Sequence, residues 1–368
     1  MRAVCLVLLI AAAAPSTADI IAEPTAKRQA APAAAEPEQS FEPAAASTAD
    51  DAATPSPPLD RRPVMRPKTA LLAMRPWSFT ATVGPVALGA ALAFKFEDVF
   101  SVPRFLLTLV TTLGVHAAGN LMNTLFDFTK GVDSPNSSDL TLVNGALLPD
   151  QVAKLIAGCY GVAAATAAPL FTMTRAPASL LAALLFAGGA SAFVYTGGPG
   201  LKYKALGDVL ISATFGPLLV GFSFLTQSGS LGWWPLLASL PITLHIEAIL
   251  HANNARDVEE DQAQGIKTLA AFLGQQRSYV LYVALIALPF VAPLYAAARH
   301  SALGALPLLA LPKARKLVAD FRAGSLARLP MKTAKFQFLF GVLFVAGVLV
   351  PSPSLGSLAQ QAARALGL

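Results

Sequence analysis

Two segments of this chain place carboxylates, amides and glycines at matching intervals. The first, residues 119–133, reads GNLMNTLFDFTKGVD, and the second, residues 253–268, reads NNARDVEEDQAQGIKT. Each contains an Asn followed by an Asp four residues later, and residues four apart share one face of a helix. Carboxylate and amide oxygens suit Mg²⁺, which binds one or two carboxylates together with substrate phosphates and water. Two such segments facing each other would hold a diphosphate through bridging Mg²⁺.

The spacing arranges these polar side chains in two stripes. The stripes are Asn123 and Asp127, with Asn120 beside them, and Asn253, Asp257 and Asp261. Asp133 follows Gly131, where the helix is expected to give way to a loop that folds back. The alternative is that these acids are ordinary charges at helix ends. Two segments with the same N-x-x-x-D start favour the metal site, because carboxylates at a membrane are costly and usually functional.

A third block, residues 195–208, reads YTGGPGLKYKALGD and is expected to form a tight loop before a helix. Lys202 and Lys204 could neutralise a leaving diphosphate, or could simply mark the cytoplasmic side of the membrane. Asp208 either caps the following helix or deprotonates a substrate ring, a role for which Glu247 is the other candidate. Arg75, in RPWSF, could bind phosphate or extend to lipid headgroups.

A third set of titratable residues lies just before the second acidic segment. His245, Glu247 and His251 follow the order H-x-E-x-x-x-H, which is not the H-E-x-x-H order of zinc proteases. A zinc site is therefore not expected. Glu247, His251 and Asn254 share a helix face, so they either line a cavity or satisfy one another inside a helix bundle.

The elements that carry these segments are predicted to span a membrane. The 368 residues are 55% hydrophobic and 13% charged, against about 25% charged residues in soluble domains. Nine apolar segments of spanning length predict an all-α membrane protein. They cover approximately residues 77–96, 104–127, 151–173, 177–196, 207–227, 232–255, 277–298, 301–320 and 334–351.

The charges fit this topology. Alternate loops carry most of the Lys and Arg residues, which places those loops and the basic start of the domain on the cytoplasmic side. The formal net charge of +6 is thereby explained, and binding to nucleic acid is not expected. The basic residues of these loops are Lys130, Lys202, Lys204, Arg256, Lys267, Arg322, Arg328, Lys332 and Lys335.

Composition also predicts the domain boundaries. Residues 1–18 resemble a targeting segment with a short apolar run; cleavage would conflict with a cytoplasmic N-terminus, and both interpretations stay open. Residues 19–68 form an Ala/Pro-rich linker that is predicted to be disordered, residues 69–352 form the membrane domain, and residues 353–368 form a C-terminal tail.

From about Leu71 to Val350 the motifs resemble the UbiA superfamily of intramembrane prenyltransferases. The motifs are RPWSF, GNLxNTxxDFxKGxD, YTGGxxxKYxxLGD, FGP and NNxRDxxxDxxxGIxTLA. They are most similar to eukaryotic members that make menaquinone and to the bacterial dihydroxynaphthoate prenyltransferase branch. The resemblance implies nine transmembrane helices around a central cavity, a lateral opening to lipid, and dependence on Mg²⁺.

The resemblance also implies roles for individual residues. Asn123, Asp127 and Asp133 would hold one Mg²⁺, and Asp257 and Asp261, helped by Asn253 or Asn254, would hold the other. The expected diphosphate contacts are Lys202, Arg256 and Lys267, together with Arg75 and the amides Asn123, Asn253 and Asn254. After the first motif the chain departs from its relatives: Leu140 and Gly145 stand where they have basic residues. This loop is expected to bind diphosphate more weakly or to accept a different donor.

The expected reaction is electrophilic aromatic substitution in a cavity that excludes water. A prenyl diphosphate, with geranylgeranyl diphosphate favoured, would alkylate menadiol or 1,4-dihydroxy-2-naphthoate in the biosynthesis of menaquinone, phylloquinone or vitamin K. The alternatives are a prenyl-lipid-binding regulatory protein and a proton- or cation-coupled transporter. The endoplasmic reticulum or Golgi is the favoured location, with a plastid or mitochondrial membrane as the alternative.

Overall fold

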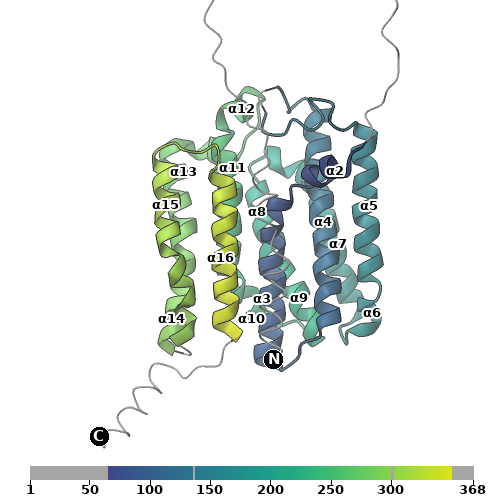
Figure 1. Ribbon diagram of the computed structural model, residues 1–368, viewed down its shortest axis with the longest axis vertical. Helices are drawn as coiled ribbons and strands as arrows, with labels where there is room; N and C mark the ends of the chain where they lie inside the picture. Colours follow the sequence, from purple (N-terminus) through teal and green to yellow (C-terminus); the bar gives the residue numbers. More distant parts are fainter. Residues whose placement is uncertain (1–64, 136, 300–301, 350–368) are drawn as a thin grey trace, which may run out of the picture.

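The structure is a computed structural model and describes residues 65–135, 137–299 and 302–349. The predicted targeting segment, residues 19–64 of the linker and the C-terminal tail lie outside these ranges. Within them the chain is helical, and the one β-bridge pairs Lys204 with Lys267. The helices stand side by side with their axes nearly parallel (Figure 1). The predicted all-α class is confirmed.

The first half of the bundle begins with short helices that lead into long ones. It comprises α2 (Pro67–Ala73), η1 (Pro76–Phe79), α3 (Thr80–Glu97), α4 (Val102–Thr129), α5 (Pro149–Ala167), α6 (Leu170–Met173) and α7 (Ala178–Thr196). The middle of the chain is more broken. It comprises η2 (Leu201–Tyr203), α8 (Gly207–Ala213), η3 (Thr214–Leu218), α9 (Leu219–Ser228), α10 (Trp233–Ala238), α11 (Leu240–Arg256) and α12 (Val258–Ala263). The rest comprises α13 (Leu269–Ala287), η4 (Leu288–Phe290), α14 (Val291–Arg299), η5 (Ala302–Ala310), α15 (Leu311–Arg322) and α16 (Leu329–Leu349).

Seven helical segments of the described ranges are long and apolar enough to cross a membrane. They are Pro76–Glu97, Val102–Thr129, Pro149–Met173, Ala178–Thr196, Gly207–Ser228, Leu269–Arg299 and Leu329–Leu349. The other two predicted spans, 232–255 and 301–320, correspond to α10–α11 and η5–α15, where α11 carries polar residues and α15 carries basic ones. The number nine therefore stays a prediction.

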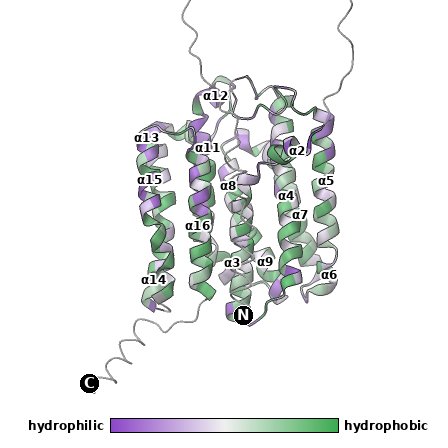
Figure 2. Ribbon diagram, viewed as in Figure 1, coloured by the Kyte–Doolittle hydropathy of each residue, from purple (hydrophilic) through white to green (hydrophobic). Residues whose placement is uncertain are grey.

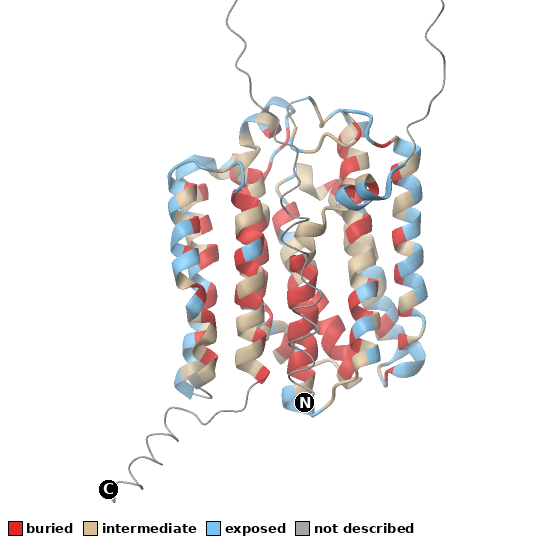
Figure 3. Cartoon of the chain, viewed as in Figure 1, coloured by how far each residue is buried: buried red, intermediate tan, exposed pale blue. Residues whose placement is uncertain are grey.

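The core of the bundle lies around α3. Most of this helix is buried, whereas α5, α7 and α13 keep exposed outer faces (Figure 3). Gly89 lets α3 approach α9 closely, because a Cβ atom there would lie 2.4 Å from the carbonyl oxygen of Val220. Exposed large apolar side chains such as Phe186 and Phe272 point outward, as expected for surfaces that meet lipid.

Hydrophilic residues gather at one end of the bundle (Figure 2). Helices α4 and α11 both finish at this end, where α2 and α12 also lie (Figure 1). The two acidic segments occupy the last turns of α4 and α11 and the residues that follow. The fold thus brings both segments to the same end of the bundle.

Candidate active site

Two adjoining hollows occupy the inside of this end of the bundle. The deeper one, a cavity of about 230 Å³, is lined mainly by apolar residues of α3, α4, α7, α8, α9 and α11. The outer one, of about 50 Å³, is lined almost entirely by polar residues of both acidic segments. Arg75, Asn123, Lys202 and Asn253 line both. A ligand with an anionic head and a greasy tail could therefore occupy the two hollows at once.

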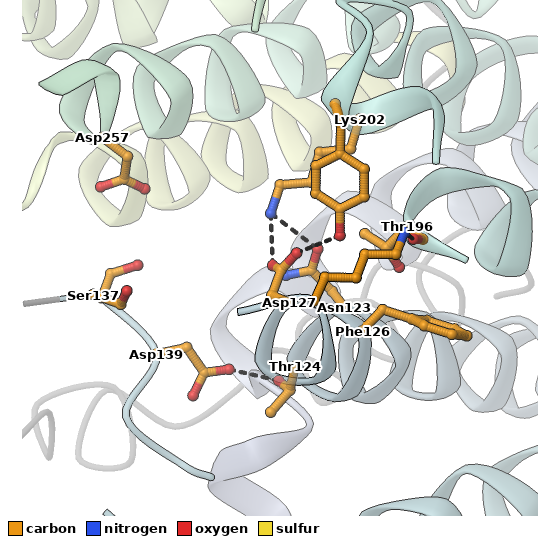
Figure 4. Close-up of polar contacts among 12 residues, drawn as sticks. Asn123, Thr124, Phe126, Asp127, Ser137, Asp139, Thr196, Lys202 and Asp257 are labelled. Atoms are coloured by element: carbon orange, nitrogen blue, oxygen red, sulfur yellow. Dashed lines mark hydrogen bonds and ion pairs between the residues drawn. The ribbon is translucent and has the colours of Figure 1, made fainter. Parts of the chain in front are cut away.

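The first acidic segment lies in the last turns of α4. Asp127 is buried, and its carboxylate contacts Lys202 Nζ at 2.7 Å and accepts a hydrogen bond from the Tyr203 hydroxyl at 2.6 Å (Figure 4). Lys202 Nζ also donates to Asn123 Oδ1 at 3.3 Å. Gly200 has φ 55°, a conformation that glycine adopts readily, and it turns the chain into η2, which carries Lys202. The Asn and Asp of this motif thus share one ammonium group.

The second acidic segment begins in the last turn of α11 and continues past the break at Asp257. Arg256 Nε contacts Asp257 Oδ1 at 2.7 Å, and its NH2 group reaches Oδ2 at 2.7 Å and Asn253 Oδ1 at 2.9 Å. This bidentate geometry fixes a carboxylate strongly. Here too the Asn and the Asp four residues on share one cation, as they do in the first segment.

The loop after the first segment is bound to the second segment. Ser134 and Ser137 both donate hydrogen bonds to Glu260 Oε1, and Arg256 NH2 donates to Ser138 Oγ at 3.0 Å. Asp127, Asp133, Asp257 and Asp261 all line the outer hollow. The structure therefore brings together the four carboxylates that the spacing singled out, and Figure 4 shows Asp127 and Asp257 on different helices beside the same space.

Two of these carboxyl groups are held in surroundings that disfavour their charge. Burial, followed by the neighbouring Asp127 and Asp139 carboxylates, raises the pKa of Asp133 to about 7. Burial is also the largest cause that raises the pKa of Asp261 to about 6, and Asp257 and Asp127 add to it. Crowded carboxyl groups of this kind mark sites that bind cations or carry out acid–base chemistry.

Arg75 and Asp139 form the remaining charged pair at the hollow. Arg75 NH2 lies 2.8 Å from Asp139 Oδ2, which also accepts from the Thr124 hydroxyl at 2.5 Å. Burial is the largest single effect on each group and opposes its charge, but the partner ion, the hydrogen bonds and the neighbouring charges together outweigh it. The pKa of Arg75 therefore lies above its usual value and the pKa of Asp139 lies below. Arg75 has φ 54°, an unusual backbone conformation that often accompanies functional residues. Neither Asp139 nor Tyr203 was predicted from the motifs to be a site residue.

The donor set fits Mg²⁺ only together with an anionic ligand. In the described ranges no three His, Cys, Asp or Glu side chains converge closely enough to hold an ion by themselves. Mg²⁺ ordinarily takes one or two carboxylates and completes its shell with phosphate oxygens and water. The paired motifs, each offering a carboxylate and an amide beside the crowded Asp133 and Asp261, meet this requirement.

Not every predicted contact lies at the hollows. Lys267 is exposed and joins the site only through its backbone N–H, which donates to the Tyr203 carbonyl at 3.4 Å. Asn254 is buried in α11 and lines neither hollow, and Lys204 is exposed. Arg256 contacts the site through Asp257 and Asn253. Roles for these residues in binding diphosphate stay predictions.

The titratable residues inside the bundle have separate partners. His245 packs between Phe rings and His251 contacts Ser278, while Glu247 accepts a hydrogen bond from Ser212 at 2.8 Å. They do not satisfy one another, and they line neither hollow. Asp208 makes no capping hydrogen bond and is buried near Glu247, so the expected cap is wrong.

Comparison with known proteins identifies the fold and the family. The profile of the UbiA prenyltransferase family matches residues 82–342. The chain belongs to the UbiA prenyltransferase family. It is 46% identical over 281 residues to UbiA prenyltransferase domain-containing protein 1 of Gallus gallus, covering 76% of this chain and 84% of that protein. The human protein of the same name is 44% identical over 287 residues, covering 77% and 85%. The chain is thus a multi-pass integral membrane prenyltransferase, an enzyme that transfers alkyl groups other than methyl.

Solved structures share the same fold. The apo structure of a UbiA homolog from Aeropyrum pernix K1 matches with a TM-score of 0.56 at 17% identity, covering 75% of this chain and 98% of that one. A UbiA homolog from Archaeoglobus fulgidus bound to GPP and Mg²⁺ matches with a TM-score of 0.50 at 15% identity, covering 76% and 99%. These likenesses support the predicted UbiA-type helical fold.

Proposed function

We propose that this enzyme transfers an isoprenyl group from a prenyl diphosphate to a naphthoquinone precursor, with Mg²⁺ held by the two acidic motifs. The observation that carries the proposal is the pair of adjoining hollows: six carboxylates line the outer one, among them the four of the acidic motifs, and a mainly apolar cavity continues inward from it. An allylic diphosphate has this same division between an anionic head and an apolar chain. The A. fulgidus homolog solved with GPP and Mg²⁺ supports the same class of donor.

The outer hollow would bind the diphosphate. Asn123, Asp127 and Asp133 would hold one Mg²⁺, and Asp257 and Asp261, with Asn253, would hold the other; the bound metal would stabilise the negative charge that grows on the leaving diphosphate. Lys202 and Arg75 lie at the junction of the two hollows. Their cations would contact the diphosphate beside the carbon–oxygen bond that breaks.

The inner cavity would hold the prenyl chain and the aromatic acceptor. Apolar residues such as Leu184, Leu218 and Phe222 line it and would exclude water, which would otherwise quench an allylic cation. The acceptor ring attacks the allylic carbon as the diphosphate leaves. The favoured donor is geranylgeranyl diphosphate, and the favoured acceptors are menadiol and 1,4-dihydroxy-2-naphthoate. The similarity to the branch that makes menaquinone and phylloquinone supports this choice of acceptors and a place in vitamin K biosynthesis.

The predicted location follows from the same similarity, and we propose a membrane of the endoplasmic reticulum or Golgi. A proton- or cation-coupled transporter would require charged groups along a path through the bundle. The carboxylates of the two acidic motifs instead gather at one end, at the mouth of a mainly apolar cavity. This arrangement favours catalysis on a diphosphate.

The test is an assay of the purified protein with geranylgeranyl diphosphate and either menadiol or 1,4-dihydroxy-2-naphthoate, with and without Mg²⁺. We expect a prenylated product that forms only with a divalent metal. Binding of the donor without any prenylated product from either acceptor would contradict the proposed acceptor class. Product formation that persists in excess chelator would contradict the role of Mg²⁺.

A further inference from the structure

A chain of hydrogen-bonded polar side chains lines the inner cavity and runs from Asn120 of the first acidic segment to Thr82 of α3. Asn120 Nδ2 donates to Ser78 Oγ at 3.0 Å, Ser78 Oγ lies 3.2 Å from His116 Nε2, and Thr82 Oγ1 lies 2.7 Å from His116 Nδ1. All four residues line the cavity. Phe79 and Phe215 pack edge-on against the His116 ring, with centroids 5.4 and 4.8 Å away, so two aromatic side chains restrain the ring.

The hydrogen bonds determine which nitrogen of His116 carries the proton. Ser78 Oγ lies 2.8 Å from the carbonyl oxygen of Arg75, which can only accept, so the single Ser78 proton is used there. Ser78 Oγ must therefore accept from His116 Nε2–H. In a neutral imidazole this leaves the lone pair on Nδ1, where it accepts the hydroxyl proton of Thr82. The Thr82 oxygen keeps its own lone pairs available to a ligand in the cavity.

His116 is also unusual among the groups around this cavity. In the described part of the chain, no Asp or Glu lines it, and the other titratable residues that do are Arg75, Lys202 and Tyr195. Arginine and lysine are already protonated, and tyrosine is a weak acid. Among these titratable residues, His116 is therefore the one that offers a basic nitrogen lone pair to the cavity wall.

Resting on the proposed function, we infer that Thr82 and His116 form a proton relay for a hydroxyl group of an aromatic hydroquinone acceptor. The acceptor hydroxyl donates to Thr82 Oγ1, and the Thr82 hydroxyl donates to His116 Nδ1. Ser78 holds the tautomer that keeps Nδ1 ready to accept. The ligand class of this part of the cavity is thus a ring with a free hydroxyl beside the carbon that is alkylated.

With this relay, every proton and electron pair of the reaction is accounted for without another reagent. A ring carbon forms a bond to the allylic carbon, while the allylic C–O bond breaks and its electron pair leaves with the diphosphate. The ring hydroxyl becomes a carbonyl as its proton passes to Thr82 and the Thr82 proton passes to His116. The substituted ring carbon then loses its proton to the departing diphosphate. The ring oxygen recovers a proton from His116 through Thr82, and the neutral imidazole is restored.

The test measures menadiol prenylation by the full-length protein under reducing conditions. Removing the hydroxyl in Thr82→Val, or the base in His116→Gln, should lower kcat by about 10²-fold, the lower end of the range for general acid–base catalysis. Thr82→Ser keeps a hydroxyl and should restore most of the rate. The double variant should lose no more than either single variant, because the two groups act as one unit.

Controls separate a lost relay from a damaged fold. Thr108 lies on the same helix as His116 but does not line the cavity, and its buried hydroxyl donates a hydrogen bond to Thr226 at 3.0 Å. Thr108→Val removes this hydroxyl and should keep wild-type kcat. Mg²⁺-dependent binding of geranylgeranyl diphosphate should be unchanged in every variant. Wild-type kcat in Thr82→Val, or no recovery in Thr82→Ser, would overturn the relay. Absence of product from the wild-type enzyme would overturn the proposed function and the relay with it.

Discussion

The two acidic motifs have the same spacing but neutralise their carboxylates differently. Asp127 depends on Lys202, which lies 75 positions away on another element, and the pair is well buried, at 6% and 16% side-chain exposure. Asp257 depends on its own neighbour Arg256, and both side chains are about one-fifth exposed, at 20% and 21%. The first motif is therefore assembled by the fold, whereas the second carries its counter-ion with it. Substitutions at the two motifs should reveal this difference.

The largest effects are expected from the carboxylates themselves. Asp127→Ala and Asp257→Ala should each lower prenyl transfer by more than about 10²-fold, because a carboxylate that holds the metal stabilises charge in the transition state. Product formation at saturating donor and Mg²⁺ measures the loss. Asp150→Ala, which breaks an exposed pair with Lys154, is the matched control. Loss of prenyl transfer in only one of the two variants would show that the two motifs do not share one substrate.

A smaller and unequal effect is expected from the two cations. Lys202→Met should lower kcat/KM for the donor by about 10²-fold, the lower end of the range for the loss of one stabilising donor. Arg256→Met should cost less, because Arg256 does not line either hollow. The control is Lys204→Met, because Lys204 directly follows η2 and its side chain is exposed. Equal losses at Lys202 and Arg256 would remove the proposed difference between the motifs.

The crowded carboxyl groups should make Mg²⁺ binding depend on pH. Asp133 and Asp261 have pKa values of about 7 and about 6, and a metal binds their ionised forms. Mg²⁺ affinity, followed by titration calorimetry with donor present, should therefore rise with pH and level off above about pH 8. Asp133→Asn should flatten the upper part of the curve. An unchanged curve in this variant would exclude Asp133 as the group that competes with the metal.

The same pKa values predict how the metal-free protein responds to pH. Both values are raised above those of an unfolded chain. The stability that they contribute is therefore fully present below about pH 4, the pKa of an unfolded Asp, and is lost progressively as the pH rises from there through about 6 and then about 7. In the absence of metal, thermal stability should fall across this range. Mg²⁺ with donor should restore it.

The smallest effect is expected where the first-motif loop binds the second motif. Glu260→Gln weakens the hydrogen bonds from Ser134 and Ser137 and should raise the KM for the donor only a few-fold, since neutral hydrogen bonds are weaker than charged ones. Glu259, an acid of the same short helix, gives the matched control Glu259→Gln. A rise in KM that is equally large in the control would show that the contact does not position the loop.

The sequence predicted the helices and the meeting of the motifs because both follow from local patterns. Apolar runs of membrane-spanning length define the helices, and the four-residue spacing places Asn123 with Asp127 and Asn253 with Asp257. The sequence could not show which cation pairs with which carboxylate. Lys202 was offered as a diphosphate contact, yet its bond to Asp127 depends on how α4 and η2 pack.

Contacts between distant segments were the least visible from the sequence. His116 is a single histidine in an apolar helix, and only the fold places Ser78 and Thr82 beside its two nitrogens. Asp139 lies in a loop, and only the fold brings it into contact with Arg75, 64 positions away. The predicted role of Lys267 came from similarity to a motif, and the structure places its side chain in solvent.

Binding of geranylgeranyl diphosphate without acceptor tests most directly whether both motifs hold one diphosphate. Calorimetry should show tight binding to the wild-type protein only when Mg²⁺ is present, and loss of that binding in Asp127→Ala and in Asp257→Ala alike. Binding that persists at wild-type affinity in either variant, or that needs no divalent metal, would contradict the shared site.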